Sequence, residues 1–159
     1  MCQLDFEVSL FSFLYYTGVP FPVPTAAEDY LNTIGYVDVE LYRGGDSFDV
    51  ERVCNSLAFG YPVLVSALRS LTAGHTWVID GYLKQYRVGA KYGEESGDYY
   101  GTETEFREML HCNWGWKDGL HNGYFYVGVF DSDNPVVETR SSDGDCYDKF
   151  YRILTYKLP

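Results

Sequence analysis

This chain has few positive charges and no long apolar run. Its 159 residues contain 12 lysines and arginines against 23 aspartates and glutamates, which gives a formal net charge of −11. Nucleic acids and anionic membranes attract basic patches, so this charge argues against both as partners. No stretch approaches the ~18 consecutive apolar residues of a membrane span, because Gly18, Pro20 and Pro22 interrupt the best candidate. We also find no basic start, apolar run and small-residue cleavage site, so no signal peptide is expected within these residues.

Cysteine is scarce, and its spacing fits no common metal or redox motif. The four cysteines occupy positions 2, 54, 112 and 146. Three pairings are open if they are oxidised; otherwise we expect mostly buried free thiols.

No metal and no cofactor are expected. A zinc site from His111, Cys112 and His121 is weakly supported, since adjacent residues on a strand point to opposite faces. A calcium site at residues 131–134 lacks the twelve-residue loop with its terminal glutamate, and we interpret that acidic stretch as a solvated loop.

Length and composition predict a single domain over residues 1–159 with one core. Aromatic residues make up 18% of the chain, sixteen of them tyrosines, which suits a protein rich in amphipathic strands. The predicted helices come first and antiparallel strands follow, an order typical of the α+β class.

The first half of the chain predicts short helices. We expect an initial helix to about residue 16, an extended proline-rich link at 19–24, and a helix over 26–33 that Gly35 stops. A strand or loop at 37–42 follows. Apolar spacing then predicts a helix over 48–59, which Asp46 or Ser47 can cap and which places Cys54 on its buried face as a structural cysteine.

Strands dominate the second half. Residues 62–68 and 76–86 form the predicted core pair, and the turn-rich segment 93–98 predicts the tip of a hairpin whose return strand ends at Cys112. Further strands are expected at 124–130 and 150–158.

One short segment carries a histidine suited to proton transfer. Residues 74–81, GHTWVIDG, are rich in β-branched and aromatic residues between two glycines, which predicts a buried strand with His75 at its start. An imidazole with an unperturbed pKa of about 6.5 exchanges protons near neutral pH, provided that its tautomer is fixed.

A second segment supplies groups that could hold this histidine. Residues 111–116, HCNWGW, offer the Asn113 side-chain carbonyl as an acceptor for a ring N–H. Trp114 and Trp116 could keep water from that hydrogen bond. The long hairpin explains how strand pairing can return Asn113 to the neighbourhood of His75 across 38 positions.

Together, the two segments resemble the motifs of the streptopain family of papain-like cysteine peptidases. By that resemblance His75 matches the catalytic histidine, Asn113 the asparagine that orients it, and Trp114 the tryptophan that covers the pair. The likeness covers most of the chain from about residue 12, including segments 30–36 and 57–65. It implies a papain-like fold, here mainly the antiparallel β lobe preceded by short helices, and incomplete.

The nucleophile of this family lies at the start of a helix far upstream of the histidine, yet only 74 residues precede His75. Cys112 and Cys146 come too late in the chain. Cys2 precedes a helical pattern whose N-terminus would lower a thiol's pKa, although Asp5 and Glu7 would oppose a thiolate. We therefore expect the nucleophile outside this chain, with Cys2 as the alternative.

Two functions follow from the resemblance. The first is a cysteine endopeptidase, or its base-carrying part, acting on polypeptides and secreted or held at the cell envelope. An inhibitory propeptide or a nucleophile-bearing segment would be its partner. The second is an inactive relative that keeps the fold and binds peptides or serves a structural role. Gly74 and Trp116 are expected to border a substrate groove in the first case.

Overall fold

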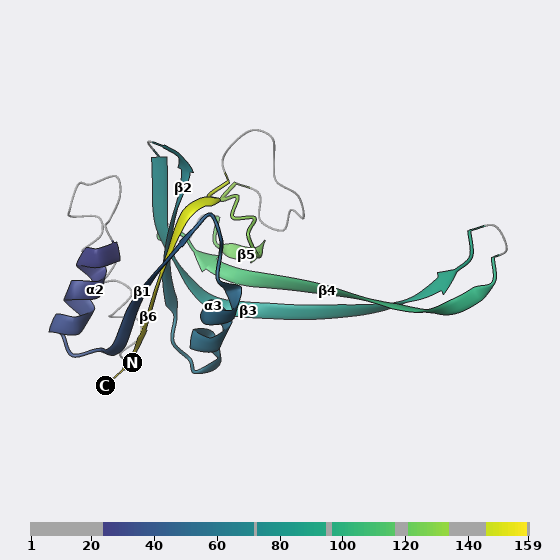
Figure 1. The fold of residues 1–159 in the computed structure, drawn as a ribbon, viewed down its shortest axis with the longest axis horizontal. Helices are drawn as coiled ribbons and strands as arrows, with labels where there is room; N and C mark the ends of the chain where they lie inside the picture. Colours follow the sequence, from purple (N-terminus) through teal and green to yellow (C-terminus); the bar gives the residue numbers. More distant parts are fainter. Residues whose placement is uncertain (1–23, 72, 95–96, 117–120, 134–145, 159) are drawn as a thin grey trace.

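The computed structural model describes residues 24–71, 73–94, 97–116, 121–133 and 146–158. It is an α+β fold in which one six-stranded antiparallel sheet carries a helix on each face. The strand order is β1-β6-β2-β3-β4-β5, and the two strongest predicted strands, β2 and β3, are central (Figure 1). None of the helices in the described ranges has the length and apolar character needed to cross a membrane.

The predicted strands are present, with revised ends. The sheet consists of β1 (Val37–Gly45), β2 (Val63–Ser70), β3 (Ala73–Tyr92), β4 (Tyr99–Asn113), β5 (Gly123–Tyr126) and β6 (Lys149–Lys157). The expected strand over 124–130 was too long. It stops at Tyr126 because a turn follows, in which Val129 N–H donates to the Tyr126 carbonyl (2.9 Å) and Gly128 has a φ of 80°.

Helix α2 (Pro24–Thr33) confirms the predicted helix over 26–33 and its stop at Gly35. Gly35 adopts a φ of 94°, and the next amide, Tyr36 N–H, donates back to the Leu31 carbonyl (3.0 Å). This is a Schellman ending, which requires the left-handed conformation that glycine adopts without strain. The expected initial helix and most of the proline-rich link lie outside the described residues.

Helix α3 (Val50–Ala58) corrects one prediction. Asp49, rather than Asp46 or Ser47, caps it, because its carboxylate accepts the Arg52 N–H at 3.0 Å. Asp46 instead accepts the Phe150 N–H (3.1 Å), and Ser47 N–H closes a turn to the Gly44 carbonyl (3.1 Å). Val53 faces the core, and Cys54 packs beside it half-buried, as expected for a structural cysteine.

Strand alternation divides the core between the two faces. On the α2 face, Leu64, Val78 and Leu154 pack with Ala27 and Leu31 of the helix. The opposite face, beside α3, is the larger and more aromatic core. Its fully buried members include Val53, Val65, Trp77, Ile79, Cys112, Trp114, Phe125, Phe130 and Ile153. Strands that are buried on both faces have continuous apolar runs in their sequences, which explains why β2 and β3 were predicted so clearly.

The acidic stretch near residue 131 is not the solvated loop that its composition indicated. Asp131 and Ser132 are buried. Asp131 accepts the Asp133 N–H (3.1 Å) and forms a β-bridge with Cys146. Hydrogen bonding within the turn compensates burial of the carboxylate.

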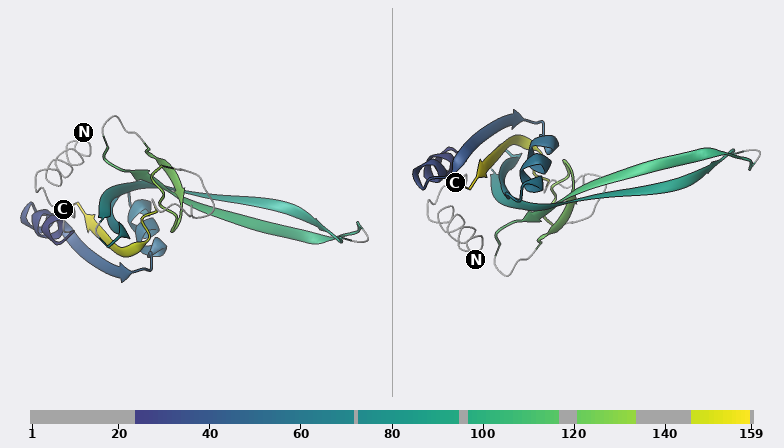
Figure 2. Two further views of the ribbon diagram at one scale, coloured as in Figure 1. Left: turned by 90° about the horizontal axis from the view of Figure 1, so that it is seen from above. Right: turned by 90° about the horizontal axis from the view of Figure 1, so that it is seen from below.

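Strands β3 and β4 continue far beyond the sheet as a two-stranded arm. β2 pairs with β3 only up to Ile79, and β5 pairs with β4 only from Met109. Between these limits β3 and β4 pair with each other alone, and the arm extends away from the body (Figures 1 and 2). The predicted hairpin tip at 93–98 is confirmed as the connection between them.

Candidate active site

His75 lies at the beginning of β3, where the sequence predicts it. Its neighbours across the β2–β3 pairing are fixed: Gly74 pairs with Leu68, and His75 with Ala67. Two residues farther along the strand, Trp77 is fully buried in the α3-side core. Because alternate strand residues share a face, His75 is held at the rim of that core by a rigid element.

Three aromatic rings surround the His75 imidazole. The centroid of its ring lies 5.9 Å from that of Trp114 in a stacked arrangement, 5.4 Å from Trp116 and 5.9 Å from Tyr147. Burial among these rings lowers the pKa of His75, and a hydrogen bond to the Trp114 backbone opposes that shift. The neutral imidazole is therefore favoured at neutral pH.

The carbonyl oxygen of Trp114 holds the ring. It lies 2.8 Å from His75 Nε2. A carbonyl only accepts, so the proton of the neutral ring is on Nε2 and the lone pair is on Nδ1. This tautomer presents Nδ1 as the atom able to take a proton.

Asn113 does not make the hydrogen bond that the sequence suggested. Its Oδ1 accepts from Gly115 N–H (3.1 Å) and from Asn122 Nδ2 (3.2 Å), whereas the His75 ring bonds to the next residue's backbone. Asn113 thus shapes the turn that carries the Trp114 carbonyl and contacts the histidine through it.

Asn122 is a site residue that sequence reasoning missed. Its Oδ1 accepts the Trp114 N–H at 2.9 Å while its Nδ2 donates to Asn113. The Asn122 carboxamide therefore links Asn113 and Trp114 of the second motif. In the sequence, the pair Asn122-Gly123 predicts a turn and gives no sign that the Asn122 side chain links Asn113 to Trp114.

Trp116 lies between two histidines. Its ring is 5.4 Å from His75 and makes an edge contact with His121 at 5.2 Å. His121 in turn faces Asp133, with Nδ1 3.5 Å from the carboxylate. Trp116 is half-buried, so part of its surface borders solvent next to the imidazole.

Two of the cysteines in the described ranges, Cys54 and Cys112, have raised thiol pKa values. Cys112 is fully buried on the core face, and burial strongly raises the pKa of its thiol. Burial also raises the pKa of Cys54, with the Glu108 carboxylate adding to the effect and Lys84 opposing it. Cys146 is buried as well. Cys2 lies outside the described residues.

A second histidine, His111 of the second segment, bonds to Asp80 of the first. His111 Nδ1 lies 2.5 Å from the Asp80 carboxylate, and its ring makes an edge contact with Tyr124 at 5.1 Å. Alternation along the strands directs these side chains to the face opposite His75. His111 is thus not part of the His75 cluster.

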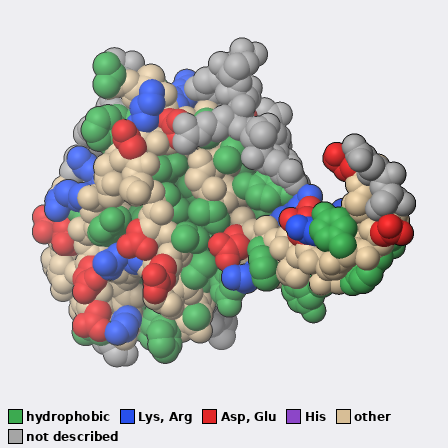
Figure 3. Space-filling model, turned by 45° about the vertical axis from the view of Figure 1, so that its right-hand side comes forward, with side chains coloured by type: hydrophobic (Ala, Val, Ile, Leu, Met, Phe, Trp, Pro, Cys, Tyr) green, Lys and Arg blue, Asp and Glu red, His purple; other side chains and the backbone are tan. Residues whose placement is uncertain are grey.

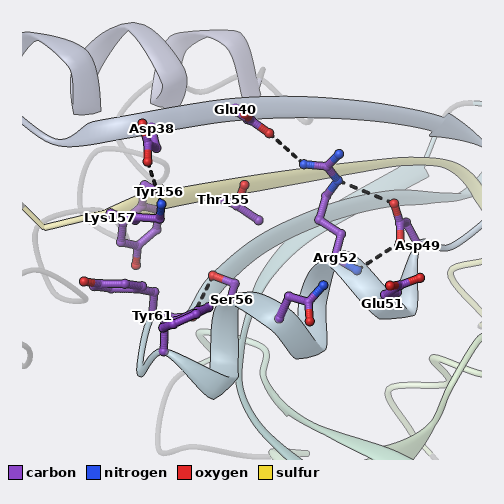
Figure 4. Close-up of a pocket in the computed structure, with 12 residues that line it drawn as sticks. Asp38, Glu40, Asp49, Glu51, Arg52, Ser56, Tyr61, Thr155, Tyr156 and Lys157 are labelled. Atoms are coloured by element: carbon purple, nitrogen blue, oxygen red, sulfur yellow. Dashed lines mark hydrogen bonds and ion pairs between the residues drawn. The ribbon is translucent and has the colours of Figure 1, made fainter.

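A surface pocket beside α3 lies apart from His75 (Figure 4). Arg52 crosses it and bonds to Glu40 at 2.8 Å, with Asp49 3.5 Å from its Nε. At the other end Lys157 pairs with Asp38 at 2.6 Å. These cations neutralise carboxylates of the wall, and we assign the pocket no chemistry.

Comparison with known proteins gives one result that bears on this site. The model of the Peptidase C10 family matches residues 26–125 of this chain, a range that contains His75, Asn113, Trp114 and Asn122. No curated protein matches the chain.

Proposed function

The chain belongs to the Peptidase C10 family, a family of cysteine peptidases, and from this premise we propose that His75 is the general base and acid of a papain-like peptidase. The observation that carries the proposal is the hydrogen bond of 2.8 Å between His75 Nε2 and the Trp114 carbonyl. It leaves Nδ1 unprotonated, which is the atom that must meet a thiol.

The proposed reaction has two halves. A thiol transfers its proton to His75 Nδ1, and the thiolate attacks the peptide carbonyl carbon. As the C–N bond breaks, the imidazolium gives that proton to the leaving amine. His75 then removes a proton from water, whose oxygen attacks the thioester and releases the carboxylic acid and the thiol.

Asn113 and Trp114 are proposed to act by positioning. The Asn113 carboxamide fixes the turn through Gly115 N–H, and the Trp114 ring stacks on the imidazole while its carbonyl holds Nε2. Since Nε2 keeps its proton in both states of the ring, this bond stabilises the imidazolium without competing for the catalytic proton.

The nucleophile is proposed to lie outside the described residues. Cys112 and Cys54 have raised thiol pKa values, whereas a catalytic thiol has a lowered one. It comes from chain beyond these 159 residues or, as the alternative, from Cys2. Gly74 and Trp116 would then border the groove for a polypeptide substrate, at a secreted or cell-envelope location as in streptopain-like enzymes.

The second candidate is an inactive relative that binds peptides or serves as a structural module. The raised thiol pKa values favour it for this chain taken alone.

Labelling with a peptidyl epoxide probe, which thiolates open, separates the two candidates. If the peptidase proposal holds, the probe labels one cysteine at pH ~6, and His75→Ala abolishes the labelling. His111→Ala is the matched control, because that histidine lies in the second motif but faces away from His75. Absence of labelling in the wild-type chain and in any longer natural form of it would overturn the peptidase proposal and leave the inactive relative.

A further inference from the structure

The β3–β4 arm exposes an aromatic face that nothing in the described structure covers. Pairing places Tyr86 opposite Phe106 and Val88 opposite Thr104, so their side chains share one side of the ribbon. Tyr86 is 73% exposed and Phe106 64%. We call this surface the arm face; it comprises Tyr82, Tyr86, Val88, Tyr92, Tyr99 and Phe106.

The opposite side of the same ribbon is polar. Arg87 pairs with Glu105, and Lys91 bonds to Glu103 at 3.2 Å. The alternation therefore gives one largely aromatic side and one polar side, although the Lys84–Glu108 ion pair (2.7 Å) lies on the aromatic side between Tyr82 and Tyr86. Figure 3 shows hydrophobic side chains gathered along the arm, which comes forward on the right.

An uncovered ribbon of this kind is marginal in water, since a two-stranded hairpin needs a third strand or a packed face for stability. Contiguous exposed apolar surface of this size marks an interaction site on soluble proteins. We propose that the arm face is a homodimer interface, in which the arm of a second copy packs antiparallel across it.

The exposed area is close to what a dimer requires. Five aromatic side chains and one valine, each half to three-quarters exposed, present roughly 600 Å² of mostly apolar surface, given the 150–250 Å² of an aromatic side chain. A standard interface buries about 800 Å² per partner. Backbone and side-chain atoms along the edges of the ribbon would supply the remaining buried area.

The charge distribution favours a second copy over a charged partner. The chain carries −11 overall, yet the paired part of the arm is nearly balanced, with Lys84, Arg87, Lys91 and Arg107 against Glu103, Glu105 and Glu108. Two arms can therefore approach without the repulsion that would separate two acidic bodies. A basic partner would be drawn to the body instead.

Geometry permits a two-fold arrangement. Beyond the pairing of β4 with β5, β3 continues from Lys84 to Tyr92, nine residues that extend about 30 Å at the rise of a strand. Two antiparallel arms can overlap along that length with the bodies at opposite ends (Figures 1 and 2). Tyr86 and Val88 lie near the middle of the arm, so they would flank the two-fold axis and meet their counterparts.

Sedimentation velocity over a concentration series tests the proposal on the whole chain. We expect a dimer with a dissociation constant in the micromolar range, strengthened by salt because screening reduces repulsion between the acidic bodies. Tyr86→Ser/Phe106→Ser should weaken it roughly 30-fold or more, since truncating one aromatic anchor commonly costs about tenfold. Arg87→Ser/Glu105→Ser, the adjacent pair on the polar side, should change it less than about threefold.

A cross-linking experiment distinguishes loss of the interface from unfolding of the arm. Val88→Cys should form a disulfide-linked dimer under mild oxidation, whereas Arg87→Cys on the other side should not exceed the wild-type background. A monomer at all concentrations, equal weakening by the two double variants, or equal cross-linking at positions 87 and 88 would overturn the proposal. It is independent of the peptidase function, which these measurements do not touch.

Discussion

His75 and Trp114 are joined in two ways: the Trp114 carbonyl lies 2.8 Å from the Nε2 atom, and the indole of the same residue stacks on the imidazole with centroids 5.9 Å apart. The hydrogen bond stabilises the charged ring, while the stacking removes water and stabilises the neutral one. Burial is the larger effect and lowers the pKa of His75. The imidazole is therefore favoured in its neutral form and held in a fixed orientation.

The first prediction concerns pH and stability. In the unfolded chain His75 has a pKa of about 6.5, and in the folded protein its pKa is lower. The unfolded state therefore binds more protons near and below pH 6.5, so this contribution is fully present above that pH and is lost as the pH falls through it. We expect wild-type protein to lose more unfolding free energy than His75→Gln between pH 7.5 and 5.

Chemical denaturation at each pH measures this difference, and taking it against the variant cancels the carboxylates common to both proteins. NMR titration of the ring gives the pKa directly. A His75 pKa at or above 6.5 would contradict the burial argument.

The second prediction concerns Asn122 as a positioning residue. Asn122→Ala leaves the Trp114 N–H and the Asn113 carboxamide each short of a partner, and we expect a loss of about 1–3 kcal/mol in unfolding free energy. Asn32→Ala is the control, since it removes an exposed side-chain bond to the Glu28 carbonyl on α2 and should cost much less.

Stability alone would not distinguish positioning from mere structure, so the ring nitrogens of His75 provide the second measurement. In wild-type protein, ¹⁵N shifts should show the proton on Nε2. In Asn122→Ala the two tautomers should mix and the pKa of His75 should move, because the Trp114 carbonyl is no longer fixed. Unchanged ring shifts would reduce Asn122 to a structural role.

Local sequence signals predicted most of the fold because they act within one element. Gly35 ended α2, runs of apolar and β-branched residues marked β2 and β3, and the turn residues at 93–98 identified the hairpin tip. Each of these depends on backbone conformation or on burial of neighbouring residues. Such local preferences can be recognised without knowing which residues distant in the sequence pack nearby.

The cap of α3 shows what local signals could not decide. Asp46, Ser47 and Asp49 are all good capping residues, and the choice depends on Phe150, 104 positions away, whose N–H bonds to Asp46. Because the Asp46 carboxylate accepts the Phe150 N–H of β6, Asp49 caps the helix, which begins at Val50. Tertiary contacts select among equivalent local options.

The arrangement of the candidate site residues was predicted in the same uneven way. His75, Asn113 and Trp114 were found as residue types in a motif, and pairing of Val78 with Asn113 brings the second segment close to the first. The sequence suggested the Asn113 side chain as the acceptor, whereas the backbone carbonyl of Trp114 holds the ring and Asn113 bonds to the turn that follows it. Residue types do not distinguish these two oxygens, so the structure was needed to identify the acceptor.

The third prediction tests the revised cap. Asp49→Ala removes the acceptor of the Arg52 N–H, and we expect it to lower the unfolding free energy by about 1 kcal/mol. Ser47→Ala should lie within about 0.5 kcal/mol of wild type, because Ser47 contributes its backbone to the turn. Urea denaturation compares the two, and the reverse order would restore Ser47 as the cap.

The fourth prediction concerns the thiols. Iodoacetamide reacts with the thiolate. At a fixed pH below the pKa, each unit by which the pKa rises therefore lowers the thiolate fraction, and with it the alkylation rate, about tenfold. Cys54, half-buried, should react slowly at pH 8, and Cys112 only after unfolding, as followed by peptide mapping. His75→Ala should change neither rate, because the structure pairs neither thiol with the imidazole.

Glu108 offers a sharper test of the cause. Its carboxylate contributes to the raised pKa of Cys54, and it also binds Lys84 at 2.7 Å, the cation that opposes the shift. Glu108→Gln removes the first effect and releases the lysine, so both changes lower the pKa of Cys54 and should speed its alkylation. Gln85→Glu, which adds a charge to the other side of the ribbon, should leave that rate nearly unchanged. Fast labelling of Cys54 in wild-type protein at pH 5 to 6 would instead identify an activated thiol on α3, and the search for the nucleophile would return to the described chain.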